Sequence, residues 1–273
     1  ATPSLGLQLR PGDAACKSLH LRLYRRGDPV AMSDMLPLLE NFDLRILNER
    51  PYRIGSGDGL WIQDLEVTHA GGKVLDPQQS GARFSEAFFA VWNGRAESDG
   101  FNRLVLAAGL DWRQALVLRA VCRYLLQTGL PFSQRYMESV LARHPGLAAR
   151  LAWLFEARFD PRLAPATRTS QQRSLAREID EALEQVTSPD DDRILRAFRA
   201  VIATALRTNH FQRVSGGEPK GYLSIKLEPK QLLELPKPRP MFEIWVYSPR
   251  VEGVHLRMGK VARGGLRWSD RRE

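Results

Sequence analysis

Alternation of polar and apolar residues marks the first clear element of the chain. In Lys17-Ser-Leu-His-Leu-Arg-Leu-Tyr, leucine recurs at every second position, so Leu19, Leu21 and Leu23 share one face of a predicted half-buried strand. Gly27-Asp28-Pro29 then breaks the pattern. The strand therefore ends in a turn, and a new element is expected beyond it.

A short helix and a hairpin are predicted after this turn. Ser33 is expected to cap the helix and Asp43 to end it, with apolar side chains between them facing inward. Extended segments 44–54 and 60–68 follow, joined by Gly55-Ser-Gly-Asp-Gly, a turn sequence that suits a hairpin. The whole unit has the order strand, helix, strand, strand.

Helical periodicity replaces alternation between Phe84 and Phe211. Apolar residues recur there every three or four positions, the spacing of helices that bury one face. Ser133 is expected to begin one helix, which Pro145-Gly146 ends, and His210 is expected to close the last one. The stripes include Ala115, Leu118, Cys122 and Leu125, and then Leu147, Leu151, Leu154, Phe155 and Phe159.

Three consecutive aspartates in Ser188-Pro-Asp-Asp-Asp separate two of these predicted helices. A metal site is one interpretation, but consecutive side chains do not converge on one ion without an unusual loop. Helix N-termini favour negative charge, so helix capping is the preferred interpretation.

Strand patterns return from Gly216 onward. Segments 222–227, 241–248 and 254–258 read as strands, and Pro236-Lys-Pro-Arg-Pro is a stiff connector ahead of the second. Asp270-Arg-Arg-Glu273 has the form of a capping box, which predicts the start of a helix.

The charge of the chain bears on its partners. The formal net charge is +9, and clustered basic residues would suggest a nucleic acid. Pairs such as Arg119 and Arg123, or Arg196 and Arg199, instead lie on helix faces opposite the apolar residues, which predicts solvated faces. Nucleic-acid binding is therefore the least favoured alternative.

Composition favours a cytoplasmic protein with no membrane partner. No apolar run is long enough to cross a bilayer, and no basic-then-apolar leader opens the sequence. Cys16 and Cys122 are its two cysteines, which argues against a disulfide scaffold. Both are expected to be reduced thiols, and at least one is expected in the core.

Few residues show a pattern typical of catalysis. The histidines lack metal-ligand spacing, so no metal site is predicted. Arg263 is followed by Gly264 and Gly265, which places a guanidinium beside a backbone without Cβ atoms, where a small carboxylate could lie close to main-chain amides. A simple bend with solvated arginines is the alternative interpretation of this segment.

Two parts of the chain resemble known families. The strand, helix, strand, strand order resembles the first part of an ACT domain, a ferredoxin-like module that senses amino acids in many metabolic enzymes. Arg239-Pro-Met-Phe-Glu-Ile-Trp-Val-Tyr-Ser-Pro-Arg-Val-Glu-Gly-Val-His-Leu-Arg, with Gly259-Lys-Val-Ala-Arg-Gly-Gly-Leu-Arg-Trp-Ser-Asp-Arg-Arg-Glu, resembles the start of the catalytic domain in large bacterial NAD-dependent glutamate dehydrogenases. This second motif covers about the last 35 residues.

The resemblance implies an α+β fold in four parts. An N-terminal lead (residues 1–16) precedes an ACT-like module (17–75), a helical domain (76–215) and the start of the catalytic domain (216–273). The implied reaction is oxidative deamination of L-glutamate to 2-oxoglutarate and ammonia with NAD, by a homo-oligomer that is expected to be a tetramer.

The same resemblance assigns roles to residues. Smaller glutamate dehydrogenases hold the substrate carboxylate with a Lys-Gly-Gly motif, onto which Arg263, Gly264 and Gly265 fall. The catalytic lysines and aspartate and the NAD-binding domain are implied downstream, so we expect an internal fragment that is inactive alone, with no catalytic or NAD-binding residue. It would serve amino-acid catabolism through assembly and allosteric regulation, with a candidate amino-acid effector site in residues 17–74. A stand-alone amino-acid-binding or oligomerisation module is the alternative.

Overall fold

The chain folds into two compact units in a computed structural model that describes residues 5–13, 17–57, 59–232, 235, 237–259 and 267–270. The first unit contains residues 1–93 and 97–112, and the second contains residues 94–96 and 113–273. Each unit combines helices with an antiparallel sheet, which confirms the predicted α+β class.

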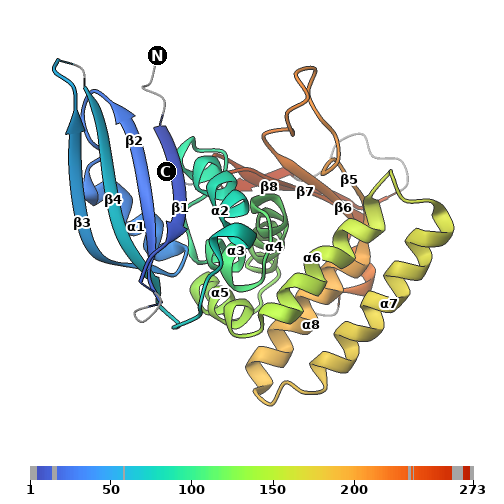
Figure 1. Cartoon of the computed structure of the whole chain (residues 1–273). Helices are drawn as coiled ribbons and strands as arrows, with labels where there is room; N and C mark the ends of the chain where they lie inside the picture. Colours follow the sequence, from blue (N-terminus) through green and yellow to red (C-terminus); the bar gives the residue numbers. More distant parts are fainter. Residues whose placement is uncertain are drawn as a thin grey trace. The chain divides into compact units, whose positions relative to one another are not determined.

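A four-stranded antiparallel sheet forms the first unit (Figure 1). Its strands are β1 (Leu5–Pro11), β2 (Leu19–Arg26), β3 (Leu44–Ile54) and β4 (Leu60–His69), in the spatial order β1-β2-β4-β3. The predicted strands correspond to β2, β3 and β4, and the last two form the predicted hairpin around residues 55–59.

Strand β1 lies in the stretch that the sequence assigned to an N-terminal lead. It pairs antiparallel with β2, from Leu5 opposite Arg25 to Pro11 opposite Leu19. In a ferredoxin-like β-α-β-β-α-β module the last strand follows the second helix. Here a strand that precedes the module occupies the edge beside β2, so the sheet is completed from the N-terminal side.

Two helices, α1 (Met32–Asn41) and α2 (Pro77–Trp92), pack against this sheet and enclose the core of the first unit. Leu21 and Leu23 of β2 are fully buried there with Phe42 and Phe84, whose rings meet edge-on at 5.1 Å. A short 3-10 turn η1 (Gly100–Asn102) and helix α3 (Arg103–Ala107) complete the unit.

The prediction that Ser33 caps α1 is wrong. The helix begins two residues earlier than such a cap implies, and Ala31 occupies the cap position without a side-chain hydrogen bond. Buried Gln63 on β4 accepts a hydrogen bond from the backbone amide of Val30 at 2.7 Å and donates to its carbonyl at 2.9 Å. These bonds hold the chain ahead of the helix, so its start is set by the sheet rather than by a local cap.

Five helices belong to the helical part of the second unit. Figure 1 shows α6, α7 and α8 running alongside one another. Ser133 is the N-cap of α5, as predicted, and Ser188 is the N-cap of α8; each accepts a hydrogen bond from a backbone N–H of the first turn. The helices are α4 (Trp112–Leu125), α5 (Gln134–Arg143), α6 (Pro145–Phe159), α7 (Pro165–Leu183) and α8 (Pro189–Thr204).

A five-stranded antiparallel meander completes the second unit, with a short 3-10 turn η2 (Pro229–Gln231) after its second strand. The strands are β5 (Ala205–Thr208), β6 (Leu223–Leu227), β7 (Phe242–Tyr247), β8 (Glu252–Arg257) and β9 (Arg267–Asp270). Three predicted strands correspond to β6, β7 and β8. Asp270 pairs with Glu252 as the last residue of β9, and the rest of the predicted capping box lies outside the described residues.

The predicted extension of the last helix to His210 is wrong. Helix α8 ends at Thr204, whose carbonyl accepts a hydrogen bond from the amide of Glu228 at 3.1 Å, and Ala205 then opens β5. Pairing with β6 outweighs the local helical pattern here. His210 lies in the turn beyond the strand, where its amide donates to Thr208 Oγ1.

Candidate functional site

Helix α4 packs against the inner face of strand β7. The side chains of Glu243, Trp245 and Tyr247 alternate inward along the strand, and all three are buried. Trp245 donates from Nε1 to the carbonyl of Ala120 at 2.9 Å, and its ring meets Tyr124 edge-on at 5.9 Å. Aromatic packing and one buried hydrogen bond therefore fix α4 to the strand that carries the glutamate.

Tyr124 and Glu243 form a buried polar pair within this packing. The Tyr124 hydroxyl donates to Oε2 of Glu243, which is 4% exposed. Burial raises the pKa of Glu243, although the hydrogen bond from Tyr124 opposes that shift. Burial also raises the pKa of Tyr124, and the neighbouring carboxyl adds to the effect. This pair was not among the predicted site residues, although the alternation of Glu243 with Trp245 and Tyr247 along β7 is a sequence signal for a buried acidic residue.

The prediction that Arg119 and Arg123 lie on a solvated helix face is wrong. Arg119 is 0% exposed and Arg123 is 2% exposed. Arg123 Nε lies 3.7 Å from Oε2 of Glu252, the first residue of β8, and both side chains are buried. Periodicity identifies the apolar face of a helix, but it does not show whether other parts of the fold cover the opposite face. In α4 the opposite face is covered as well.

The segment predicted to hold a carboxylate lies between β8 and β9. These strands pair antiparallel, with His255 opposite Arg267 and Val254 opposite Trp268. Arg263, Gly264 and Gly265 lie outside the described residues. Their assignment to a substrate carboxylate stays a prediction.

Three family models match consecutive stretches of the sequence. The ACT3 domain of glutamate dehydrogenase matches residues 5–80, helical motif 3 of glutamate dehydrogenase matches residues 96–161, and the catalytic domain of bacterial NAD-glutamate dehydrogenase matches residues 178–273. The chain belongs to the large bacterial NAD-specific glutamate dehydrogenase family. The first match includes β1, and the third begins within α7, so both extend further toward the N-terminus than the ranges predicted from sequence.

Individual relatives agree with the family match. The chain is 45% identical over 256 residues to an NAD-specific glutamate dehydrogenase of Halomonas elongata, and 47% identical over 261 residues to one of Pseudomonas aeruginosa. A third, from Mycobacterium tuberculosis, is 43% identical over 255 residues. The alignments cover 90–94% of this chain, and the chain spans about 16% of the length of each of these relatives.

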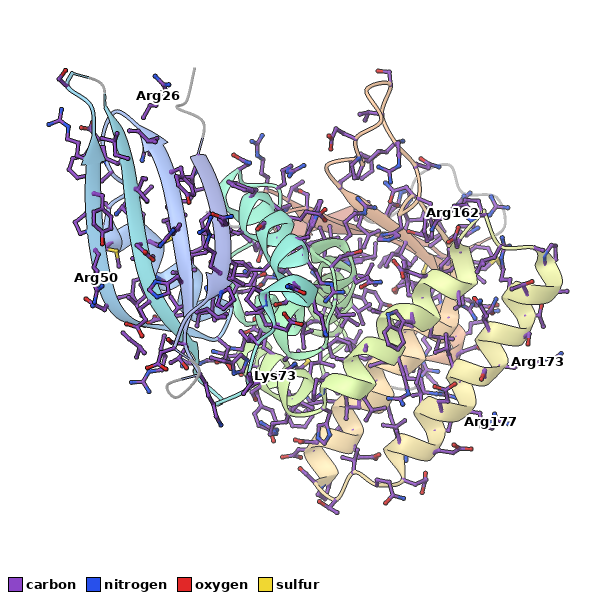
Figure 2. All side chains as sticks on the ribbon, in the orientation of Figure 1. Arg26, Arg50, Lys73, Arg162, Arg173 and Arg177 are labelled. Carbon is purple, nitrogen blue, oxygen red and sulfur yellow. The ribbon has the colours of Figure 1, made fainter. Side chains whose placement is uncertain are left out.

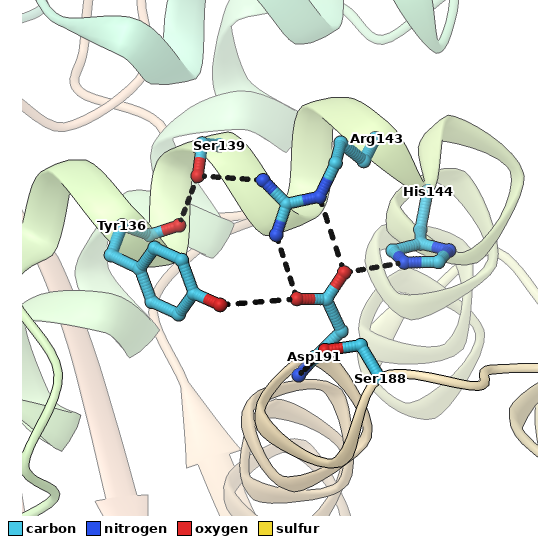
Figure 3. A network of polar contacts seen from close by, with 6 residues as sticks. All are labelled: Tyr136, Ser139, Arg143, His144, Ser188 and Asp191. Atoms are coloured by element: carbon cyan, nitrogen blue, oxygen red, sulfur yellow. Dashed lines mark hydrogen bonds and ion pairs between the residues drawn. The ribbon is translucent and has the colours of Figure 1, made fainter.

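Asp191 joins three helices of the second unit, as Figure 3 shows. Arg143 at the end of α5 donates to it twice, from Nη2 at 2.7 Å and from Nε at 3.2 Å, and His144 Nε2 lies 2.9 Å from Oδ2. Tyr136 makes a longer contact of 3.5 Å. Burial opposes the charge on Asp191, but the hydrogen bonds from Arg143 and His144 outweigh it and hold the pKa of Asp191 below its usual value.

The three consecutive aspartates therefore stabilise the N-terminus of α8. Asp190, Asp191 and Asp192 all lie in the first turn of α8 behind Ser188, which confirms the capping interpretation. Within the described ranges, no group of three metal-ligating side chains is placed to hold an ion.

The outer face of the first unit's sheet carries a smaller polar cluster. Asp64 on β4 is bound by His20 Nδ1 at 2.8 Å and by Arg22 Nε at 3.0 Å, both from β2. Each Asp64 oxygen thus has a partner within the sheet. The cluster fixes the β2–β4 pairing, and the candidate effector site in residues 17–74 stays a prediction.

Cys122 is buried on α4, as predicted for at least one of the two cysteines, whereas Cys16 lies outside the described residues. In the part of the chain that the structure describes, no helix is long and apolar enough to cross a membrane.

Proposed function

We propose that this chain functions within an NAD-dependent glutamate dehydrogenase, which converts L-glutamate and NAD to 2-oxoglutarate, ammonia and NADH. The match of residues 178–273 to the catalytic domain of bacterial NAD-glutamate dehydrogenase carries the proposal. The two other family matches, in the same protein class and in chain order, support it. The part played by this chain is assembly, regulation and one portion of the substrate site.

The glycine-rich run 55–59 does not have the surroundings of an NAD pyrophosphate loop. It joins β3 to β4, so no helix N-terminus follows it to receive a pyrophosphate. Hydride transfer requires a cofactor held against the substrate. We therefore expect the 273-residue chain to be inactive alone, with no bound NAD, and NADH formation from glutamate by the purified chain would contradict this.

Arg263 is the residue to test in the substrate site, with Gly264 and Gly265 allowing close approach to the backbone. A charge-assisted hydrogen bond to a carboxylate contributes about 1.5–3 kcal/mol. In a polypeptide of the length of the relatives, Arg263→Ala should therefore raise KM for glutamate by about tenfold to a hundredfold, with partial rescue by Arg263→Lys.

The matched control for this experiment is Arg250→Ala, because Arg250 is an exposed arginine in the turn between β7 and β8. Its KM should remain close to that of the unmodified protein. Unchanged KM and kcat in Arg263→Ala would refute the assignment of the carboxylate site.

Regulation by an amino acid is a second candidate role. The ACT3 match over residues 5–80 supports it, because the resemblance to ACT domains implies amino-acid sensing. Calorimetric titration of the chain with a panel of amino acids tests the idea. A binding heat for one amino acid that is lost in a variant of the first unit would support an effector site. If no amino acid gives a binding heat, assembly remains the proposed role of the first unit.

A cytoplasmic homo-tetramer is the proposed form of the whole enzyme, and native mass measurement tests that number. Nucleic acid is not a proposed partner, because the exposed basic residues do not gather in one surface patch. In the first unit, Arg26, Arg50 and Lys73 lie at separate places around the sheet (Figure 2). Affinity for DNA or RNA that falls steeply with salt would contradict this view.

A further inference from the structure

A pocket of about 570 Å³ opens beside the Tyr124–Glu243 pair in the second unit. This volume lies in the range of small-molecule sites. The walls come from the residues after α4, from the connector ahead of β7, and from β8. Most of the wall is apolar, formed by Leu126, Leu235, Pro238, Pro240, Val254 and Leu256.

Glu243 is the charged feature of this pocket. Its side chain lines the cavity although the residue is only 4% exposed. Tyr124 holds one carboxyl oxygen, Oε2, and no hydrogen bond to Oε1 occurs among the residues that the structure describes. A carboxyl group in an apolar wall with one open oxygen is costly to ionise unless a ligand supplies the missing partner.

The surroundings of Glu243 favour a cation. Among the described residues that line the pocket there is no lysine, arginine or histidine, although the chain carries 40 lysines and arginines against 31 acidic residues. Residues Leu126 to Gly129 follow the C-terminal end of α4, where the helix dipole presents partial negative charge. Both fixed electrostatic features of the pocket therefore have the same sign.

We propose that this pocket binds a small amine, with its ammonium group on Oε1 of Glu243 and its hydrocarbon body against the surrounding leucine, valine and proline side chains. An amino acid fits less well, because the part of the lining that the structure describes offers no cation for its carboxylate. A divalent metal also fits less well, because one carboxylate cannot supply the several oxygen ligands that calcium or magnesium requires. None of the described residues along its wall is among those proposed for the substrate carboxylate.

Cyclohexylammonium and cyclohexanol are suitable probes, because they share a ring and differ in charge. With the full chain at pH 7, calorimetry should show cyclohexylammonium binding about tenfold more tightly than cyclohexanol, since a hydrogen bond to a charged group contributes at least that factor. Glu243→Gln should remove the difference between the two probes. Glu218→Gln, at an exposed glutamate of the same unit, should keep it.

A second readout uses protons. An ammonium binds the ionised carboxylate, so its affinity should rise with pH as Glu243 loses its proton, and this dependence should be absent in Glu243→Gln. Equal affinities for both probes in the unmodified chain would overturn the proposal, even if the variant failed to fold. So would stronger binding of L-glutamate than of cyclohexylammonium at this pocket.

Discussion

Asp191→Asn should destabilise the second unit, because one carboxylate joins α5, α6 and α8. The Asp191 side chain is 6% exposed, and it accepts two hydrogen bonds from Arg143 and lies 2.9 Å from His144 Nε2. An asparagine keeps one acceptor oxygen and turns N–H donors toward groups that also donate. Hydrogen bonds to charged groups contribute about 1.5–3 kcal/mol.

For Asp191→Asn, the loss in the free energy of unfolding should not exceed the upper end of that range. Removing one partner of a fully buried ion pair costs about 3–5 kcal/mol, but the Arg143 side chain is 47% exposed, so water can solvate it once Asp191 is gone. In a unit of this size, a loss of about 1.5–3 kcal/mol lowers Tm by about 3–12 °C. Thermal unfolding followed by circular dichroism measures the change.

Asp192→Asn is the matched control for this experiment. Asp192 pairs with Arg196 one turn along α8, and both side chains are substantially exposed, so the pair contributes about 0.3–0.5 kcal/mol. Equal Tm shifts in the two variants would refute the reasoning. The effect should also depend on pH: the pKa of Asp191 is lowered from 3.8, so its contribution is present above that value and is lost in stronger acid.

Three further substitutions test other contacts. Phe84→Ala should destabilise the first unit by about 3–5 kcal/mol in urea titrations because it opens a cavity beside Phe42, and a loss below 1 kcal/mol would contradict the described core. Trp245→Phe removes the hydrogen bond to the Ala120 carbonyl and should cost about 1–3 kcal/mol by the same method, with a neutral result arguing against the α4–β7 packing. Glu243→Gln should become more stable relative to the unmodified chain as pH rises above 4.5. The pKa of the buried carboxyl is raised, so above that value the ionisation of Glu243 destabilises the native state of the unmodified chain. A Tm difference between the two proteins that is independent of pH would contradict this.

Local signals predicted much of the fold. The β3–β4 hairpin follows from two extended runs around a glycine-rich turn, and it lies within about a residue of its expected bounds. Ser133 begins α5 and the aspartates lie in the first turn of α8, as predicted, because the interactions at a helix start span only about three residues. The predictions that were confirmed depend on neighbours in sequence.

The predictions that were wrong or incomplete concern residues whose partners are distant in sequence. Arg123 is buried against Glu252, and α8 stops at Thr204 because β5 pairs with β6. Asp191 was assigned to a helix start, but its further role depends on Arg143, which lies 48 residues away along the chain. The Glu243 pocket could not be foreseen, because its walls come from segments that only the fold brings together.

The placement of β1 has a consequence for how the first unit is built during synthesis. Both edge strands of its sheet belong to hairpins, with Pro11 opposite Leu19 and Ile54 opposite Leu60. The central β2–β4 ladder, with Leu19 opposite Val67, is therefore the one strand pairing in the described sheet that joins distant parts of the sequence. Short loops close at low entropic cost, so each hairpin can form as soon as it leaves the ribosome, and a single docking event then completes the ladder.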